Sequence, residues 1–337
     1  MQTFKLLRLS LFAVLIALPA ISSAQSKTVM AYYENSASRP SLHAYASYLN
    51  QIPTDTFSIN AHGKISGTAP AKAMAFAHAH GMQTFATVSN FGKSGFVAGI
   101  AESIVNNPSH SARAIQEMLR VVSTYGYSGV NVDFEAVPHR DRAAFSAFIQ
   151  AVAAAMRPAG YLTVLSAPAE LEDNPHDSWT GAFDFAALAP NVDILQLMTY
   201  DENGPWGPPG PVAGLDWVEP CVQFAVSVVP SSKISLGIPA YGYDWNLTRK
   251  TGLQVYWKNI PNLIAKMDAV PQWDAVSSSP YFSYTAPNGT SHIVWYENAQ
   301  SIPLKSALTV NYNLAGVSVF ALGFEDQSFW DAITVGF

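Results

Sequence analysis

Eight short apolar segments recur along this chain, and stretches with helical periodicity separate most of them. The segments are Thr28–Tyr33, Thr56–Asn60, Thr84–Ser89, Gly129–Glu135, Leu162–Ala167, Ile194–Tyr200, Ile234–Ala240 and Gly316–Leu322. Helical periodicity is clearest over Ala69–His80, Ser109–Tyr125 and Arg140–Arg157. A strand followed by a helix, repeated about eight times, predicts an α/β fold with a parallel sheet buried on both faces. No GxGxxG motif follows the first segment, so a (β/α)8 TIM barrel is favoured over a dinucleotide-binding sheet.

The regular spacing breaks once, between Ala240 and Gly316. Within this interval the strand-like runs are Leu253–Trp257, Tyr281–Tyr284 and His292–Tyr296, with a Pro287-Asn288-Gly289 turn before the last one. We therefore expect a small α+β insertion, at about residues 246–297, between the last two barrel strands. The rest of residues 25–337 is expected to form a single barrel domain.

The N-terminus carries the pattern of a secretory signal. Lys5 and Arg8 precede an apolar run over Leu9–Ile21, and Ser22-Ser23-Ala24 supplies small residues where a signal peptidase cuts. A run of about 13 residues is shorter than the ~20 that span a bilayer, so it predicts a cleaved signal peptide at residues 1–24. A buried N-terminal helix is the alternative. We expect a secreted or periplasmic protein with no membrane span after cleavage.

Composition excludes several functional classes. The 337 residues include 18 Lys and Arg against 24 Asp and Glu, a formal net charge of −6, which argues against nucleic acid as a partner. Charged residues make up 12% and hydrophobic residues 49%, so a large core is expected and disorder is not. Cys221 is the single cysteine, which excludes a disulfide framework. His78 and His80 match no standard metal spacing. A monomer without metal or other cofactor is expected.

The segment from Gly129 to Glu135 alternates polar and apolar residues. Asn131, Asp133 and Glu135 share one face of a strand, because residues i, i+2 and i+4 point the same way. An edge strand with a solvated acidic face is one interpretation. The other interpretation is a catalytic strand inside the barrel. It is favoured because this segment is the fourth of eight strands and barrels of this kind carry their chemistry at the C-terminal ends of the strands.

Two carboxylates two residues apart perturb each other and raise the affinity for a proton of at least one of them. A carboxylic acid that stays protonated near neutral pH is what general acid catalysis of acetal cleavage requires. The strand therefore offers candidates for such an acid in Asp133 and Glu135.

Several motifs together resemble glycoside hydrolase family 18, the chitinase-type barrels. Gly129–Glu135 resembles the DGxDxDxE signature of that family, and Leu197–Asp201 resembles its MxYD motif. Further segments resemble the spore-cortex-lytic N-acetylglucosaminidase branch; they are Ser89–Phe91, Tyr200–Asn203, Pro209–Val212, Gly237–Trp245 and Val294–Glu297. The resemblance runs from about Tyr32 to Trp330.

By this resemblance Glu135 is the general acid/base. Asp133 would orient the acetamido group of the substrate, and Tyr200 would hold its oxygen in line with the anomeric carbon. The resemblance implies substrate-assisted retaining hydrolysis of β-linked N-acetylglucosaminyl bonds, in cell-wall glycan or chitin-type oligosaccharides, with that acetamido group as nucleophile.

Three positions depart from the family pattern. Ser128 and Asn131 replace the first and middle Asp of the signature, and Phe320 stands where the last strand usually carries Trp. Asn131 can still hydrogen-bond to Asp133 but cannot share a proton as a carboxyl group does. These departures keep a non-hydrolytic glycan-binding barrel open as an alternative.

Six residues are candidates for contact with the glycan. They are Tyr32, Asn90, Asn131, Asp201, Trp206 and Phe320. The tryptophans considered as sugar platforms are Trp206, Trp217, Trp245, Trp257 and Trp295. Trp206 is favoured, because it lies in a Gly/Pro loop beyond the sixth strand.

Overall fold

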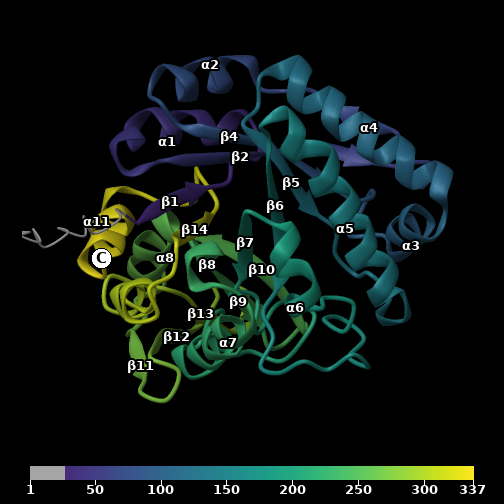
Figure 1. Cartoon of the computed structure of the whole chain (residues 1–337). Helices are drawn as coiled ribbons and strands as arrows, with labels where there is room; N and C mark the ends of the chain where they lie inside the picture. The colour runs from purple at the N-terminus through teal and green to yellow at the C-terminus, as the bar shows by residue number, and fades with distance from the viewer. Residues whose placement is uncertain (1–26) are drawn as a thin grey trace, which may run out of the picture.

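A computed structural model describes residues 27–337 of the chain, so the predicted signal peptide lies outside the described residues. Eight parallel strands form a closed barrel, and pairing of the first with the second completes the closure (Figure 1). In spatial order the barrel strands are β1 (Thr28–Ala31), β14 (Gly316–Phe320), β8 (Ile234–Pro239), β7 (Ile194–Met198), β6 (Leu162–Pro168), β5 (Gly129–Asp133), β4 (Gln83–Ser89) and β2 (Gln51–Ile59). The short strand β3 (Ile65–Gly67) pairs antiparallel with β2 outside the barrel. The predicted (β/α)8 architecture is confirmed.

Helices surround the barrel and follow the strands in the chain (Figure 1). They are α1 (Arg39–Ala44), α2 (Ala71–Ala79), α3 (Ala98–Asn106), α4 (Pro108–Tyr125), α5 (Arg142–Met156), α6 (Phe185–Leu188), α7 (Leu215–Val228), α9 (Ser301–Ser306), α10 (Leu308–Asn311) and α11 (Gln327–Val335). Helix α4 shows how local sequence sets these boundaries. Asn107 caps its first turn by accepting from the Ser109 and His110 amides, and Gly126 ends it in the left-handed region at φ 72°.

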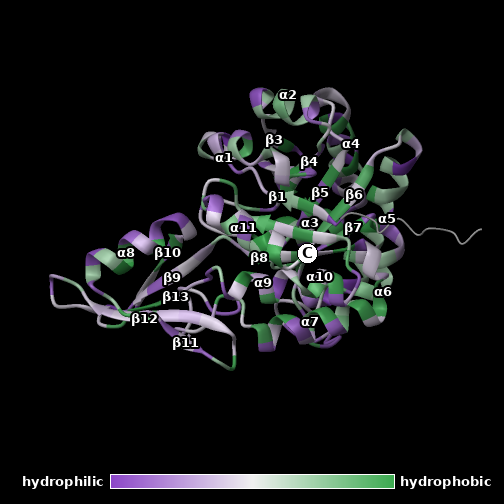
Figure 2. Cartoon of the chain, turned by 90° about the vertical axis from the view of Figure 1, so that its left-hand side faces the viewer, coloured by the Kyte–Doolittle hydropathy of each residue, from purple (hydrophilic) through white to green (hydrophobic). Residues whose placement is uncertain are grey.

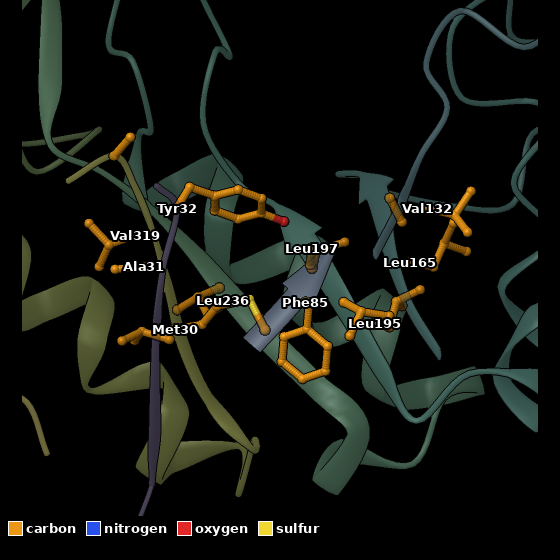
Figure 3. Close-up of a cluster of buried hydrophobic side chains, with 14 of the residues drawn as sticks. Met30, Ala31, Tyr32, Phe85, Val132, Leu165, Leu195, Leu197, Leu236 and Val319 are labelled. Carbon is orange, nitrogen blue, oxygen red and sulfur yellow. The ribbon is translucent and has the colours of Figure 1, made fainter. Parts of the chain in front are cut away.

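The core of the molecule lies inside the barrel and between the barrel and its helices. Figure 3 shows ten labelled side chains of this core, contributed by seven of the eight barrel strands or by the residue directly after a strand; they are Met30, Ala31, Tyr32, Phe85, Val132, Leu165, Leu195, Leu197, Leu236 and Val319. All are buried. Nearly continuous apolar strands are what a sheet covered on both faces requires.

The predicted insertion is present as a separate lobe beside the barrel (Figure 2). Its five-stranded antiparallel sheet consists of β10 (Thr251–Tyr256), β9 (Tyr241–Asn246), β13 (Ser291–Trp295), β12 (Ser279–Thr285) and β11 (Gln272–Asp274), and it carries helix α8 (Ile260–Met267). The sheet begins at Tyr241, directly after β8 and ahead of the predicted start near residue 246. The sequence gives no turn signal there, because the chain runs from one buried strand into the next.

The structure corrects two further expectations. Strand β2 begins at Gln51 rather than Thr56, since Pro53 takes part in the sheet by accepting from the Tyr33 amide through its carbonyl. The edge-strand interpretation of the acidic segment is wrong, because β5 lies between β4 and β6 and all five of its residues are buried.

No helix among residues 27–337 is long and apolar enough to cross a membrane.

Candidate active site

A cavity of about 800 Å³ opens at the C-terminal ends of the barrel strands. Its lining combines acidic, aromatic and small side chains. The residues are Tyr32, Glu34, Asp55, Phe91, Phe96, Asp133, Glu135, Ser166, Pro168, Ala169, Trp179, Gln196, Met198, Tyr200, Asp201, Glu202, Trp206, Trp217, Tyr241, Gln254 and Phe320. Gln254 belongs to β10, so the insertion forms part of the wall. Seven of the nine predicted site residues line this cavity.

The end of β5 places two carboxylates in the cavity. Asp133 is the last residue of the strand and is 8% exposed, and Glu135 follows two residues later. Ala136 adopts φ 53°, a left-handed conformation that is uncommon for a residue with a side chain and turns the chain away from the strand direction. Glu135 therefore lies in the loop just beyond β5.

Asn90 fixes the backbone of Glu135 from the neighbouring strand end. Its Nδ2 donates to the Glu135 carbonyl at 2.8 Å, and its Oδ1 accepts from the Glu135 amide at 2.9 Å. Asn90 is fully buried and lies outside the cavity lining. The structure thus gives Asn90 a place behind Glu135.

Burial and neighbouring charge favour a protonated Glu135. Burial raises the pKa of Glu135 well above its ordinary value, and the charges of Asp133, Asp201 and Asp55 raise it further. Burial, with Asp55 nearby, raises the pKa of Asp133 to about 7. The carboxylates titrate as a coupled group. The arrangement can hold a proton on Glu135 near neutral pH.

Tyr200 and Asp201 follow β7 and enter the same cavity. Burial raises the pKa of Tyr200, so its hydroxyl remains a hydrogen-bond donor. Gln196 Nε2 donates to the Tyr200 hydroxyl oxygen at 3.4 Å. Asp201, at φ 62°, accepts from the hydroxyls of Tyr241 at 2.6 Å and Tyr243 at 2.8 Å. These two tyrosines hold the Asp201 carboxylate in place.

Asn131 lies beneath the cavity in a hydrogen-bonded group inside the barrel. Its Nδ2 donates to the Tyr32 hydroxyl oxygen at 2.9 Å, and its Oδ1 accepts from the Ser166 hydroxyl at 3.2 Å. Within residues 27–337, the side chain of Asn131 forms no hydrogen bond with Asp133, although the sequence suggested one. Asn131 is fully buried and outside the lining, whereas Tyr32 lines the cavity.

Aromatic side chains form much of the remaining wall. Trp206 is 71% exposed and meets Tyr243 edge to face at a ring distance of 6.2 Å. Phe320 lies 5.8 Å from the Tyr32 ring and 6.0 Å from the Tyr200 ring. Exposed aromatic faces of this kind suit the apolar faces of sugar rings.

The other tryptophans named from sequence divide into two groups. Trp217 lines the cavity, whereas Trp245 and Trp257 are buried in the core and Trp295 stacks on Tyr281.

Sequence reasoning missed several lining residues. Asp55 and Glu34 lie in or after the first two barrel strands, and Trp179 lies in a long loop after β6. Glu34 and Trp179 follow a barrel strand, and this position was their one available signal, whereas Asp55 lies within β2 and had none. Single residues without a motif do not distinguish themselves from ordinary loop residues.

No cluster of three or more His, Cys, Asp or Glu side chains that could hold a metal ion occurs in the part of the chain from residue 27 onward.

A (β/α)8 barrel with carboxylates, a tyrosine and aromatic rings at the C-terminal ends of its strands defines a barrel enzyme with a glycan-sized cleft. The family model described as "Glycosyl hydrolases family 18" matches residues 28–325. The chain belongs to this family and is a glycosidase.

Relatives and solved structures agree with this assignment. The chain is 39% identical over 305 residues to "Uncharacterized glycosylase YvbX" of Bacillus subtilis, covering 90% of this chain and 89% of the relative. It is 27% identical to the "Cortical fragment-lytic enzyme" of Bacillus anthracis, covering 74% of this chain and 59% of that one. The structure of a chitinase from Chromobacterium violaceum superposes with a TM-score of 0.88 at 38% identity, covering 92% of this chain and 99% of the other.

Proposed function

We propose that this protein hydrolyses β-linked N-acetylglucosaminyl bonds in cell-wall glycan or chitin-type oligosaccharides, by substrate-assisted catalysis with retention. The observation that carries the proposal is Glu135, an acid with a raised pKa that lies beside Asp133 in an aromatic-walled cavity. The names of two related proteins, a chitinase and a cortical fragment-lytic enzyme, support the substrate class.

In this mechanism Glu135 donates its proton to the leaving glycosidic oxygen. The bond between that oxygen and the anomeric carbon breaks as the acetamido oxygen of the same sugar attacks the anomeric carbon. Tyr200 donates a hydrogen bond to the acetamido oxygen and aligns it, and Asp133 stabilises the charge that develops on the acetamido nitrogen. Glu135, now a carboxylate, then takes a proton from the water that opens the cyclic intermediate.

The placement of the carboxylates supports an acetamido nucleophile over an enzymic one. Asp133 ends β5 and Glu135 follows it by two residues, so both carboxylates lie at the end of the same strand. A retaining pair must flank the scissile bond, whereas these two approach from one side.

The other groups of the site either position these residues or bind the glycan. Asn90 and Asn131 lie behind the cavity wall, so we assign them the positioning of Glu135 and Tyr32. We assign direct contact with the glycan to Asp201, Trp206, Tyr32 and Phe320.

The signal pattern at residues 1–24 supports export, to the periplasm or the medium, where such glycans occur. We further propose that the protein acts as a monomer.

The test is hydrolysis itself. The purified protein is incubated with acetylated chitin oligosaccharides and, separately, with wall sacculi, and new reducing ends are counted. Activity on either substrate class supports the proposal. Tight binding without any new reducing ends on both would favour the non-hydrolytic glycan-binding alternative.

A further inference from the structure

The lining of the cavity, as residues 27–337 form it, contains acidic side chains but no basic ones. Six of its lining residues are carboxylic acids, namely Glu34, Asp55, Asp133, Glu135, Asp201 and Glu202. Within the described part of the chain, no Lys, Arg or His belongs to the lining. Lys93 is exposed on the loop between Phe91 and Phe96 and does not line the cavity. A glycan in this cleft therefore meets acidic groups on several sides and no basic side chain among the lining residues from position 27 onward.

Four of the six carboxyl groups have an assigned partner or role. Asp133 and Glu135 carry the proposed chemistry, and Asp201 accepts from two tyrosines. Glu202 Oε2 accepts from the Gly214 amide at 2.7 Å, with the Lys305 charge nearby. Glu34 and Asp55 remain, and neither carboxyl group takes part in a hydrogen bond or ion pair recorded among residues 27–337.

Glu34 and Asp55 lie on neighbouring strands. Asp55 is in β2, and Glu34 follows β1, whose end is held to β2 by the Tyr33 amide and the Pro53 carbonyl at 2.8 Å. Burial raises the pKa of Asp55 to about 6, and burial with the charge of Asp55 raises that of Glu34 to about 7. An acid whose charge is disfavoured by burial and by a neighbouring acid is stabilised in its charged form by a cation beside it.

A second hollow adjoins the cavity at Asp55. This groove of about 330 Å³ shares Asp55, Phe91 and Phe96 with the main cavity. The Phe91 and Phe96 rings meet edge to face at 5.0 Å, and Phe91 is 47% exposed. A glycan longer than the main cavity can continue into this groove, and its next sugar then passes Asp55.

We propose that Glu34 and Asp55 are specificity-determining residues that make the cleft favour neutral and cationic sugars, such as glucosamine in partly de-acetylated chitin, over sugars with a carboxylate substituent. This inference rests on the proposed function and specifies which glycans of that substrate class the cleft prefers. An ammonium group at the sugar beside Asp55 gains attraction from both acids. A carboxylate substituent there, as on a muramyl sugar that bears no peptide, meets repulsion in a partly buried site where charges are weakly screened.

The experiment uses one oligosaccharide of N-acetylglucosamine with a single glucosamine at a fixed internal position. Its amine is left free, converted to a neutral N-succinamoyl group, or converted to an N-succinyl group of the same size that carries a carboxylate. The kcat/KM of the full-length protein is measured for all three at pH 7 and low salt. The neutral and anionic forms differ in charge alone.

We expect the wild type to cleave the free-amine and neutral forms on the order of 10-fold more efficiently than the anionic form, with the ratio reduced in 0.5 M salt. In a Glu34→Gln/Asp55→Asn double variant the ratio falls to about 2-fold or less. A Glu172→Gln/Asp268→Asn variant has the same change in net charge on exposed residues outside the lining, and it should keep the wild-type ratio.

Two results would overturn the inference: equal cleavage of neutral and anionic forms by the wild type, or an unchanged ratio in the Glu34/Asp55 variant. Should the double variant fail to fold, each single substitution must lower the ratio, or the inference is wrong. Failure of the proposed function looks different, because the wild type would then cleave none of the three. In that case the charge preference is read from affinities of the Glu135→Gln variant for the same oligosaccharides.

Discussion

At the residue scale, the chemistry depends on which groups of the cavity hold a proton. Glu135 and Asp133 both have raised pKa values because they are buried beside other acids. The hydroxyl of Tyr200 stays protonated for the same reason, since burial disfavours its anion. One group can therefore donate a proton and another a hydrogen bond at the same pH.

Replacing Tyr200 with Phe removes the hydroxyl and keeps the ring against Phe320. We expect kcat to fall on the order of 10-fold or more with little change in KM, because a hydrogen bond to a developing charge is worth ~1.5–3 kcal/mol and acts mainly in the transition state. Steady-state kinetics on an acetylated oligosaccharide checks this. An unchanged kcat with a raised KM would assign Tyr200 to ground-state binding instead.

The pH profile follows from the sign of these shifts. Glu135 must be protonated to act as an acid, so kcat/KM should fall as the pH rises through the pKa of the coupled group. The charge of Asp55 contributes to the raised pKa of both Asp133 and Glu135. Asp55→Asn removes this charge, which lowers both pKa values and should move the alkaline limb to lower pH. A limb that stays in place or moves to higher pH would contradict the electrostatic account.

At the element scale, the functional residues lie where strands stop. The sequence pattern predicted that two strands run to Glu135 and to Tyr200. In the structure β5 ends at Asp133 and β7 ends at Met198. The left-handed residues Ala136 and Asp201 turn the chain at these points. Neither position is a glycine, which would have indicated a turn, so the exact last residue of each strand could not be predicted.

Asn90 joins the ends of β4 and β5, and its loss should affect stability and turnover together. Asn90→Ala leaves the buried amide and carbonyl of Glu135 without partners, at a cost of about 1–3 kcal/mol in the free energy of unfolding. We expect kcat to fall as well, because Glu135 is no longer fixed. Urea unfolding and steady-state kinetics measure the two effects.

Two variants separate position from stability. Asn90→Asp keeps an acceptor for the Glu135 amide and should recover part of kcat. Asn60→Ala removes a similar side-chain bridge in an exposed turn and should leave kcat unchanged. Wild-type turnover in a folded Asn90→Ala variant would show that Asn90 has no positioning role.

At the scale of the whole molecule, the sequence predicted more of the barrel than of the cavity. Eight apolar runs and one interruption were enough to predict eight parallel strands and an insertion, because burial on both faces leaves a strong local pattern. The cavity gathers residues from separate strands and loops, and Glu34, Asp55 and Gln254 come together only through tertiary packing. Asp133, Glu135 and Tyr200 could be named because each belongs to a recognisable sequence motif.

A buried ion pair joins the end of the insertion to the barrel helices. Lys305 of α9 donates to Glu297, which follows β13, and both side chains are almost fully buried. Lys305→Met should lower the free energy of unfolding by about 3–5 kcal/mol, because it leaves a buried carboxylate without its partner. A Lys305→Met/Glu297→Gln double variant should recover much of this loss in urea unfolding. A loss below about 1 kcal/mol for the single variant would show that the pair is dispensable.

The central claim is that Glu135 makes this barrel a hydrolase rather than a glycan-binding protein. The most direct measurement compares wild type and Glu135→Gln on one acetylated chitin oligosaccharide, with turnover from new reducing ends and affinity from calorimetry. We predict wild-type hydrolysis, and a variant that binds the oligosaccharide with similar affinity but is slower by about 10²–10⁴-fold, the usual contribution of general acid catalysis. A variant that keeps more than about a tenth of the wild-type rate, or a wild type that binds without hydrolysis, would contradict the claim.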